Sequence, residues 1–332
     1  MSKYDQVDTS SPFYSPVAEA AIAEVAARVS NHGRWGDDDV LGTMNFLDEA
    51  KRIEGASRVQ RGVTFSLAQS YDGNGPQMGW RRRMNPIHTM LVSGLDAEFG
   101  PVDMPHGFGG SDDYVVMPLQ ASTQWDGLGH IFDHGVAYNG RRAGSVVTSE
   151  GDQVTGIETV ADRIAGRGVL LDVGRVLGEN GELPDGYAIT VDDLEKTIAA
   201  QGETSAVGRG DIMLVRTGQL SRVRRDGWGS YAGGDAPGLS FTTAEWLHER
   251  EIAAIATDTW GFEVRPNEFE NAFQPLHQVV IPHMGLFIGE MWDLEDLGAD
   301  CAIDGVYDFL LAAAPVPVTG AVGSPVNPIA IK

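Results

Sequence analysis

Short apolar runs separated by helical segments constrain the fold of this chain more than any other feature. Residues 169–173, 210–216 and 252–257 are apolar without strict alternation, as expected of strands that are buried on both faces. Between these runs, Thr190 is predicted to cap one helix, and Thr242 or Thr243 is predicted to cap a second that ends near Arg250. Strands that alternate with helices are typical of an α/β domain, here with a mixed sheet.

The front of the chain has a different pattern. Residues 16–30 are rich in alanine and predict a surface helix, residues 43–55 predict a second short helix, and residues 63–67 predict a strand. Residues 1–60 are therefore expected to form an N-terminal helical segment that packs on a main domain of residues 61–332. Residues 71–110 are glycine-rich and predict a long irregular loop, which is either a lid, a subunit contact or plain solvated chain.

Charge limits the partners that the chain can bind. The 332 residues include 24 basic and 47 acidic side chains, which gives a net charge of −23 and argues against nucleic acid or an anionic membrane as partner. The single cysteine, Cys301, cannot form an internal disulfide. Residues 1–6 lack the apolar core of a signal peptide, and no stretch reaches the roughly 18 to 20 apolar residues of a membrane span. These features predict a cytoplasmic protein with a small-molecule substrate.

Candidate metal ligands follow an apolar run, residues 114–119, that predicts a buried strand. The sequence continues Gln120-Ala-Ser-Thr-Gln-Trp-Asp-Gly-Leu-Gly-His130, whose two glycines predict a tight turn. Asp126 and His130 offer a carboxylate and an imidazole, which are good ligands for zinc or manganese. Taken alone, a polar strand end with one hydrogen-bonded aspartate and a stray histidine explains the stretch as well.

A second cluster lies far downstream. A predicted helical turn at residues 277–280 precedes an apolar strand that ends at Glu290, so His277 and Glu290 could point to one place. Residues 291–297 then predict a short surface helix. One aspartate and one histidine hold a divalent ion poorly, whereas Asp126, His277 and Glu290 together make a credible site.

The first of these two clusters resembles a motif of the cyclase family of metal-dependent hydrolases, which includes kynurenine formamidases, isatin hydrolases and a trans-dienelactone hydrolase. The family pattern is His-x-Gly-Thr-His-x-Asp-x-Pro-x-His. Thr123, Asp126 and His130 match it, whereas Gln120 and Gln124 replace the two leading histidines, Ser122 the glycine and Leu128 the proline. The later His–Glu pair of the family resembles His277 and Glu290 with one residue inserted, so His283 could instead take the place of His277. The Asp258-Thr259 pair also resembles a family feature.

The resemblance implies a swivelling β/β/α domain with long loop insertions, assembled as a homodimer or homotetramer whose loops reach a neighbouring site. It implies one divalent ion per subunit, zinc or manganese, held by Asp126, His277 and Glu290, with the amide oxygen of Gln124 as a further ligand. A second ion is not expected, because glutamine binds zinc less well than imidazole does.

The implied activity is hydrolysis of a cyclic amide, imide or lactone, or of a related amide, by metal-activated water. His130 is the candidate general acid and base, with a fourth metal ligand or a partner of Asp126 as alternatives. Two other functions compete: an arylformamidase acting on N-formylkynurenine, and a metal-free binding protein that has lost the catalytic site. Candidate substrate-binding residues are Gln120, Trp125, Trp260, Arg82, Asn85 and His88.

Overall fold

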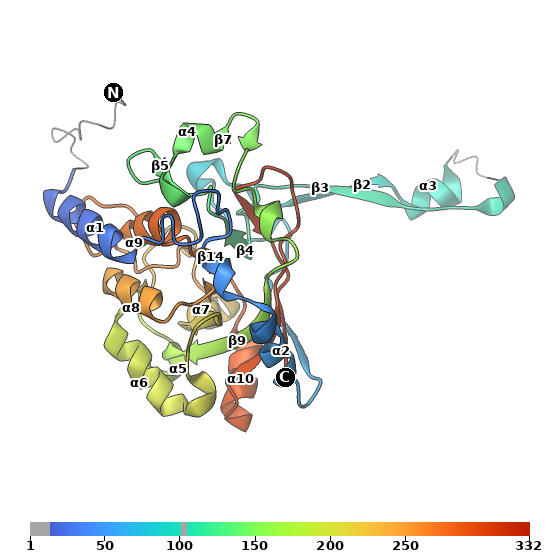
Figure 1. Cartoon of the computed structure of the whole chain (residues 1–332). Helices are drawn as coiled ribbons and strands as arrows, with labels where there is room; N and C mark the ends of the chain where they lie inside the picture. The colour runs from blue at the N-terminus through green and yellow to red at the C-terminus, as the bar shows by residue number, and fades with distance from the viewer. Residues whose placement is uncertain (1–13, 101–104) are drawn as a thin grey trace.

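The computed structural model describes residues 14–100 and 105–332, and its centre is a nine-stranded mixed sheet (Figure 1). The strand order is β1-β17-β15-β9-β11-β13-β14-β4-β16, in which β9, β11, β13 and β14 are parallel and the other pairs are antiparallel. This mixed α/β architecture confirms the predicted fold class. The strands are β1 Thr64–Ser66, β4 Gln124–Asp126, β9 Ala165–Asp172, β11 Ile212–Arg216, β13 Ala254–Thr257, β14 Phe287–Glu290, β15 Asp308–Ala312, β16 Gly323–Pro325 and β17 Ile329–Ile331.

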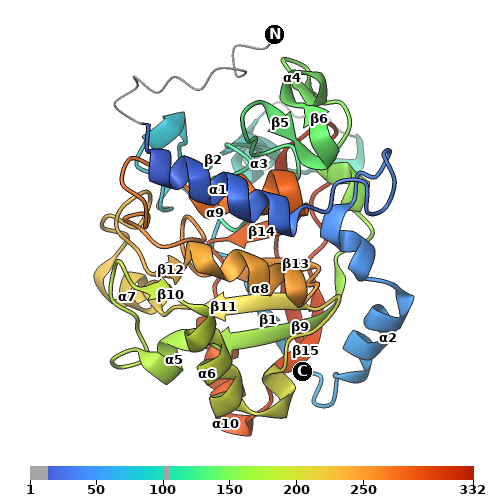
Figure 2. The ribbon, with the colours of Figure 1, turned by 60° about the vertical axis from the view of Figure 1, so that its left-hand side comes forward.

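Helices cover one face of the sheet, with α1 and α8 in front of the strands in Figure 2. Their apolar side chains form one core with Val169, Leu171 and Val215 of the central strands. The next residues along these strands, such as Leu170 and Leu214, point into a second core under α10 and β15. Burial on both faces explains why these runs do not alternate. The helices are α1 Pro16–Val29, α2 Glu49–Ser57, α3 Gly94–Phe99, α4 Ala143–Val146, α5 Val173–Leu177, α6 Val191–Gln201, α7 Gln219–Asp226, α8 Ala244–Glu249, α9 Pro275–Val279 and α10 Glu295–Asp304.

Local capping sets several helix starts. Thr190 and Asp193 form a capping box at α6, as the sequence predicts. Thr243, one of the two predicted caps, is the N-cap residue of α8, but its side chain makes no capping hydrogen bond; the Ser240 side chain instead caps the 3-10 turn Phe241–Thr243 that precedes this helix. The single helix predicted at residues 43–55 is also wrong. It is a 3-10 helix, Gly42–Phe46, followed by α2, which starts where Asp48 accepts a hydrogen bond from the backbone amide of Lys51.

The sheet curls so that distant strands approach each other. The indole Nε1 of Trp125, on β4, donates a hydrogen bond to the carbonyl of Ala313 just after β15, at 2.8 Å. The Trp125 ring also packs edge-on against Trp292, with the centroids 4.8 Å apart. Trp292 is fully buried, so the surface helix predicted at residues 291–297 is wrong; α10 begins only at Glu295.

A two-stranded ribbon replaces much of the predicted irregular loop. β2 (Ile87–Val92) pairs with β3 (Asp112–Val116), and the pair extends away from the body with α3 near its far end (Figure 1). The strand predicted at residues 114–119 was expected to be buried, yet every residue of β3 is exposed. An apolar run indicates a surface that favours burial, but it does not show whether the same chain or another chain buries that surface.

The predicted boundary at residue 60 stays a prediction, although α1 packs on α8 and α9 and α2 packs on β9. The expectation about residues 1–6 lies outside the described residues. Within the part that the structure describes, no helix is both long and apolar enough to cross a membrane.

Candidate metal centre

Two neighbouring strands and one short helix bring three ligands together. Asp126 ends β4 and Glu290 ends β14, and these strands pair so that Glu290 lies opposite Gln124 and Ile288 opposite Asp126. His277 lies in α9. One ligand atom from each of Asp126, His277 and Glu290 lies within 4.8 Å of the others, and all three residues are buried. The two distant sequence clusters therefore meet at one point.

Gln124 lies beside this triad. Successive side chains of a strand point to opposite faces, so Gln124 and Asp126 share the face on which Glu290 lies. The Gln124 amide nitrogen donates a hydrogen bond to Glu290 Oε2 at 2.8 Å, and its Oε1 atom is buried with no hydrogen-bond partner among the described residues. An orphaned amide oxygen next to two carboxylates adds an oxygen donor to the set.

His277 and Glu290 have shifted pKa values. Burial and the nearby charge of Asp126 raise the pKa of Glu290. Burial lowers the pKa of His277, but hydrogen bonds to Glu263 and Glu290 outweigh burial and raise it. Two buried carboxylates repel each other unless a positive charge lies between them. Two carboxylates, an imidazole and an amide oxygen are a donor set that fits a divalent ion.

Glu263 fixes the orientation of His277. Its Oε1 atom lies 2.7 Å from His277 Nδ1 and also accepts the backbone N–H of His277, while Oε2 accepts the N–H of Leu276. With Nδ1 held in this way, Nε2 faces Glu290 Oε1 at 3.1 Å. Sequence reasoning missed Glu263. The sequence feature that could have identified Glu263 is its place between the apolar residues Phe262 and Val264, because a charged side chain is costly to bury there without a partner.

His130 follows the ligand turn and lies at the mouth of the site. Its Nε2 atom is 3.7 Å from Asp126 Oδ1, which is beyond hydrogen-bond distance. Burial lowers the pKa of His130, and the positive charge of Arg83 lowers it further. A neutral imidazole at this place can accept a proton.

A cavity opens over the triad. Its inner part, about 10 Å³, has room for roughly one water molecule. The adjoining outer part measures about 280 Å³ and shares Arg81, His130, Gln274 and His277 with the inner part. Trp260 lines the inner part, as expected of a substrate-binding residue, and so do Trp80 and Arg83, which the sequence did not single out.

Five of the six candidate substrate-binding residues do not line this cavity. Trp125 points away from the cavity because the next residue of its strand, Asp126, lines the cavity and successive side chains alternate; the Trp125 side chain is 0% exposed in the core. Arg82 is exposed and Asn85 bonds within its own loop, accepting the N–H of Gln77. His88 lies on the ribbon, where it contacts Asp113. Gln120 is half-buried and does not line the cavity.

His283 lies outside the ligand set. Its Nε2 atom is 2.8 Å from Asp133 Oδ2, and its ring stacks on His32 with the centroids 5.4 Å apart. Of the two histidines that the sequence left open, the structure brings only His277 to Asp126 and Glu290.

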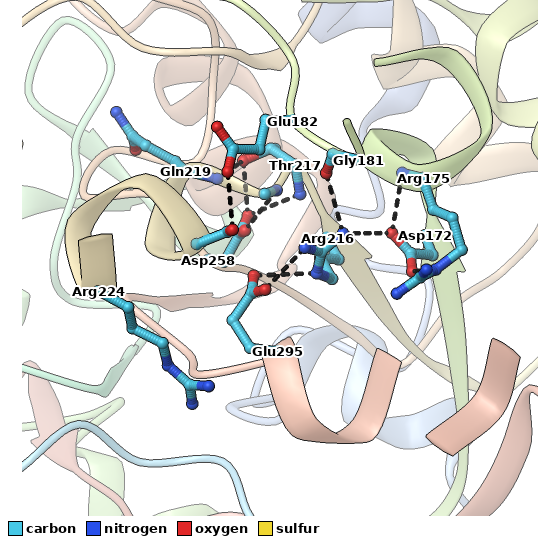
Figure 3. A network of polar contacts seen from close by, with 12 residues as sticks. Asp172, Arg175, Gly181, Glu182, Arg216, Thr217, Gln219, Arg224, Asp258 and Glu295 are labelled. Atoms are coloured by element: carbon cyan, nitrogen blue, oxygen red, sulfur yellow. Dashed lines mark hydrogen bonds and ion pairs between the residues drawn. The ribbon is translucent and has the colours of Figure 1, made fainter. Parts of the chain in front are cut away.

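Asp258, the other residue of the family resemblance, belongs to a polar network at the carboxyl ends of the parallel strands (Figure 3). Its carboxylate accepts the N–H and the hydroxyl of Thr217, both at 2.8 Å, and burial raises its pKa to about 6. Beside it, Arg216 joins Asp172 to Glu295 through bonds of 2.7 Å. These contacts tie β9, β11 and α10 together, and β13 separates this group from β14, the strand that carries Glu290.

The fold and the buried triad define an α/β protein with a candidate metal centre. The Cyclase family model matches residues 49–264, and the chain belongs to this family. A crystal structure described as that of a novel cyclase is 38% identical, with a TM-score of 0.82 over 92% of this chain and 99% of the other.

More distant structures share the fold. Isatin hydrolase A from Labrenzia aggregata, bound to benzyl benzoate, is 16% identical with a TM-score of 0.59 over 84% of this chain and 96% of that one. The Ralstonia solanacearum isatin hydrolase A is 17% identical with a TM-score of 0.59, over 84% of this chain and 95% of that one. No curated protein sequence matches the chain.

Proposed function

We propose that the protein is a metal-dependent hydrolase that opens a cyclic amide, imide or lactone, or cleaves a related amide. The observation that carries this proposal is the convergence of Asp126, His277 and Glu290 in a buried site with His130 at its mouth. Isatin hydrolases, which share the fold, give the proposal its substrate class.

The triad would hold one divalent ion, zinc or manganese, with the Gln124 amide oxygen as a fourth donor. When bound, such an ion lowers the pKa of water and polarises a carbonyl group. Glu263 would keep the proton of His277 on Nδ1, so that Nε2 has a free lone pair for binding. Burial of the triad excludes bulk water from the site.

His130 would move the proton. Its Nε2 atom, held near Asp126 and kept neutral by burial, accepts a proton from the attacking water and returns it to the leaving nitrogen or oxygen. Because the ring lies beyond hydrogen-bond distance of Asp126, it is free to contact a substrate.

Metal content and hydrolysis measured together test this function. Asp126→Ala should lose the bound metal, ring-opening activity toward isatin and a lactone panel, and formamide hydrolysis of N-formylkynurenine. His130→Ala should keep the metal and lose turnover. His283→Ala, whose residue lies outside the triad, is the control and should keep the metal. Metal loss in His130→Ala, or full activity in Asp126→Ala, would overturn the assignment.

The same proposal includes a homo-oligomer. A two-stranded ribbon is marginally stable alone in water, yet β2 and β3 extend from the body with large apolar side chains exposed on both strands. We propose that a second copy of this chain buries the apolar surface of the ribbon, since closed homo-oligomers are the commonest assemblies of soluble proteins. The exposed apolar residues of the ribbon and α3 are Ile87, Met90, Leu91, Leu95, Phe99, Tyr114, Val115 and Val116.

A further inference from the structure

Two arginines line the cavity without a carboxylate partner. Among residues 14–100 and 105–332, neither Arg81 nor Arg83 makes an ion pair or a side-chain hydrogen bond, although the chain holds 47 acidic side chains against 24 basic ones. Other arginines near the sheet, such as Arg167 and Arg216, each bind at least two carboxylates. The cavity therefore holds positive charge that the described part of the protein leaves available.

Aromatic rings hold these two arginines in place. The Arg81 guanidinium lies 5.4 Å from the centre of the Trp80 ring, and the Arg83 guanidinium lies 5.6 Å from that of Trp260. The two tryptophan rings meet edge to face at 5.0 Å, and Phe273 lies 5.6 Å from Trp80. Rings that already pack against guanidinium groups leave flat apolar walls beside fixed hydrogen-bond donors.

The backbone separates Arg82 from its two neighbours. Arg81 and Arg82 both adopt left-handed backbone conformations, with φ of 51° and 63°. Arg81 and Arg82 are both exposed, but Arg81 and Arg83 line the cavity and Arg82 lies outside it. Two consecutive left-handed residues other than glycine are costly, and such strain is commonly kept at binding sites.

A third donor belongs to a residue that lines the same cavity. Trp260 lines the inner cavity, and its indole Nε1–H is buried with no acceptor among the described residues. A buried donor without a partner carries a penalty that a ligand oxygen can remove. Arg81 and Arg83 therefore lack a carboxylate partner, and Trp260 lacks a hydrogen-bond acceptor, among the described residues.

We infer that the substrate is a planar, ring-containing carboxylate whose ring lies in the outer part of the cavity beside Phe273, while its carboxylate binds Arg81, which lines both parts, and Arg83, which lines the inner part. Guanidinium groups pair with carboxylates in a planar, directional way that a neutral carbonyl does not reproduce. The inference rests on the proposed hydrolase function only in saying which kind of bond of this substrate is hydrolysed. A neutral substrate would leave both arginines unpaired in the cavity.

Calorimetric titration of the metal-loaded protein with benzoate and with benzamide tests the inference without turnover. The two probes differ in charge but share ring and size. Benzoate should bind at least ~10-fold more tightly than benzamide, as expected of charge-assisted hydrogen bonds. Arg83→Gln and the double variant R81Q/R83Q should reduce this ratio to near one, and Arg83→Lys should keep part of it.

Arg82→Gln is the matched control, since it removes the same charge from the same loop but outside the cavity. The ratio should stay unchanged in R82Q. Equal affinities for the two probes, no detectable benzoate binding, or an equal loss in R82Q and R83Q would overturn the inference. A ratio that is insensitive to R83Q would mean that benzoate binds the metal, and would overturn it as well.

The hydrolase proposal can fail separately. If the wild-type protein prefers benzoate but does not hydrolyse isatin, the lactone panel, formanilide or 2-formamidobenzoate, the anion site stands and the proposed reaction falls. If both formamides are hydrolysed, kcat/KM should favour 2-formamidobenzoate, and R83Q should remove this preference mainly through KM. Faster hydrolysis of formanilide would count against the anion site alone.

Discussion

His277 and Glu263 form a buried pair in which His277 Nδ1 lies 2.7 Å from Glu263 Oε1. The pair sets which imidazole nitrogen faces Asp126 and Glu290. Glu263→Gln should therefore weaken metal binding by about 10- to 100-fold, the usual cost of losing the partner of a metal-binding histidine. Competition with a chromophoric chelator measures the affinity. Glu270→Gln, an exposed acid on the same loop, is the control and should bind metal as the wild type does.

Trp125 should act on stability rather than on substrate binding. Trp125→Phe removes the hydrogen bond to Ala313 and part of the contact with Trp292, so it should lower the free energy of unfolding by about 1–3 kcal/mol. Denaturant unfolding measures this change. KM for any hydrolysed substrate should stay near the wild-type value in W125F and rise in Trp260→Phe, whose residue lines the cavity. A raised KM in W125F together with an unchanged KM in W260F would indicate that Trp125, rather than Trp260, contacts the substrate.

Asp133 should stabilise the protein near neutral pH and lose this effect in acid. Burial raises the pKa of Asp133, but hydrogen bonds from His283 and Gln278 outweigh burial and hold the pKa below its ordinary value of 3.8. A carboxylate with a lowered folded-state pKa stabilises the fold above its unfolded pKa, and the effect disappears as pH falls through the folded-state value. Asp133→Asn should cost about 1–3 kcal/mol near neutral pH.

The difference in unfolding free energy between wild type and D133N should shrink as pH falls below 3.8. Asp113→Asn offers a comparison, because Asp113 contacts His88 in an exposed pair on the ribbon and should contribute little at any pH. A difference that stays constant down to strongly acidic pH would show that the Asp133 charge has no part in stability.

The ribbon should determine assembly. Val115→Glu places a charge on the exposed apolar surface of β3, so the dissociation constant of the oligomer should rise at least ~10-fold, while the body should keep its melting temperature. Light scattering across a concentration series measures the assembly. Ile303→Glu introduces the same charge at an exposed apolar position on α10 and should leave assembly unchanged. A wild-type protein that is monomeric at every concentration would contradict the prediction.

The sequence predicted the parts of the molecule whose signal is local. The apolar runs of β9, β11 and β13 and the Thr190 cap of α6 are visible in a few residues each, and the structure confirms them. The meeting of Asp126 with Glu290 was predictable from the resemblance, although only strand pairing brings the two residues together.

The remaining features depend on geometry that one chain segment does not carry. The sequence singled out Arg82 as a substrate-binding residue, yet Arg82 lies outside the cavity that Arg81 and Arg83 line. Left-handed backbone angles decide which of the three arginines line the cavity, and a sequence does not reveal them. The predicted burial of β3 failed because a run of apolar residues does not reveal which surface covers it. Glu263 was missed because its contact with His277 spans 14 positions of irregular chain.

β4 and β14 are hydrogen-bonded neighbours in the middle of one half of the sheet, with β16 and β13 on their outer sides. Strand pairing consequently fixes the backbone positions of Asp126 and Glu290 relative to each other, and it limits how far their carboxylates can move apart. Calcium, which takes roughly six to eight oxygen ligands at longer distances, would require them to move further apart. We therefore expect the site to bind small divalent ions such as zinc or manganese more tightly than calcium when the ions are compared at equal concentration.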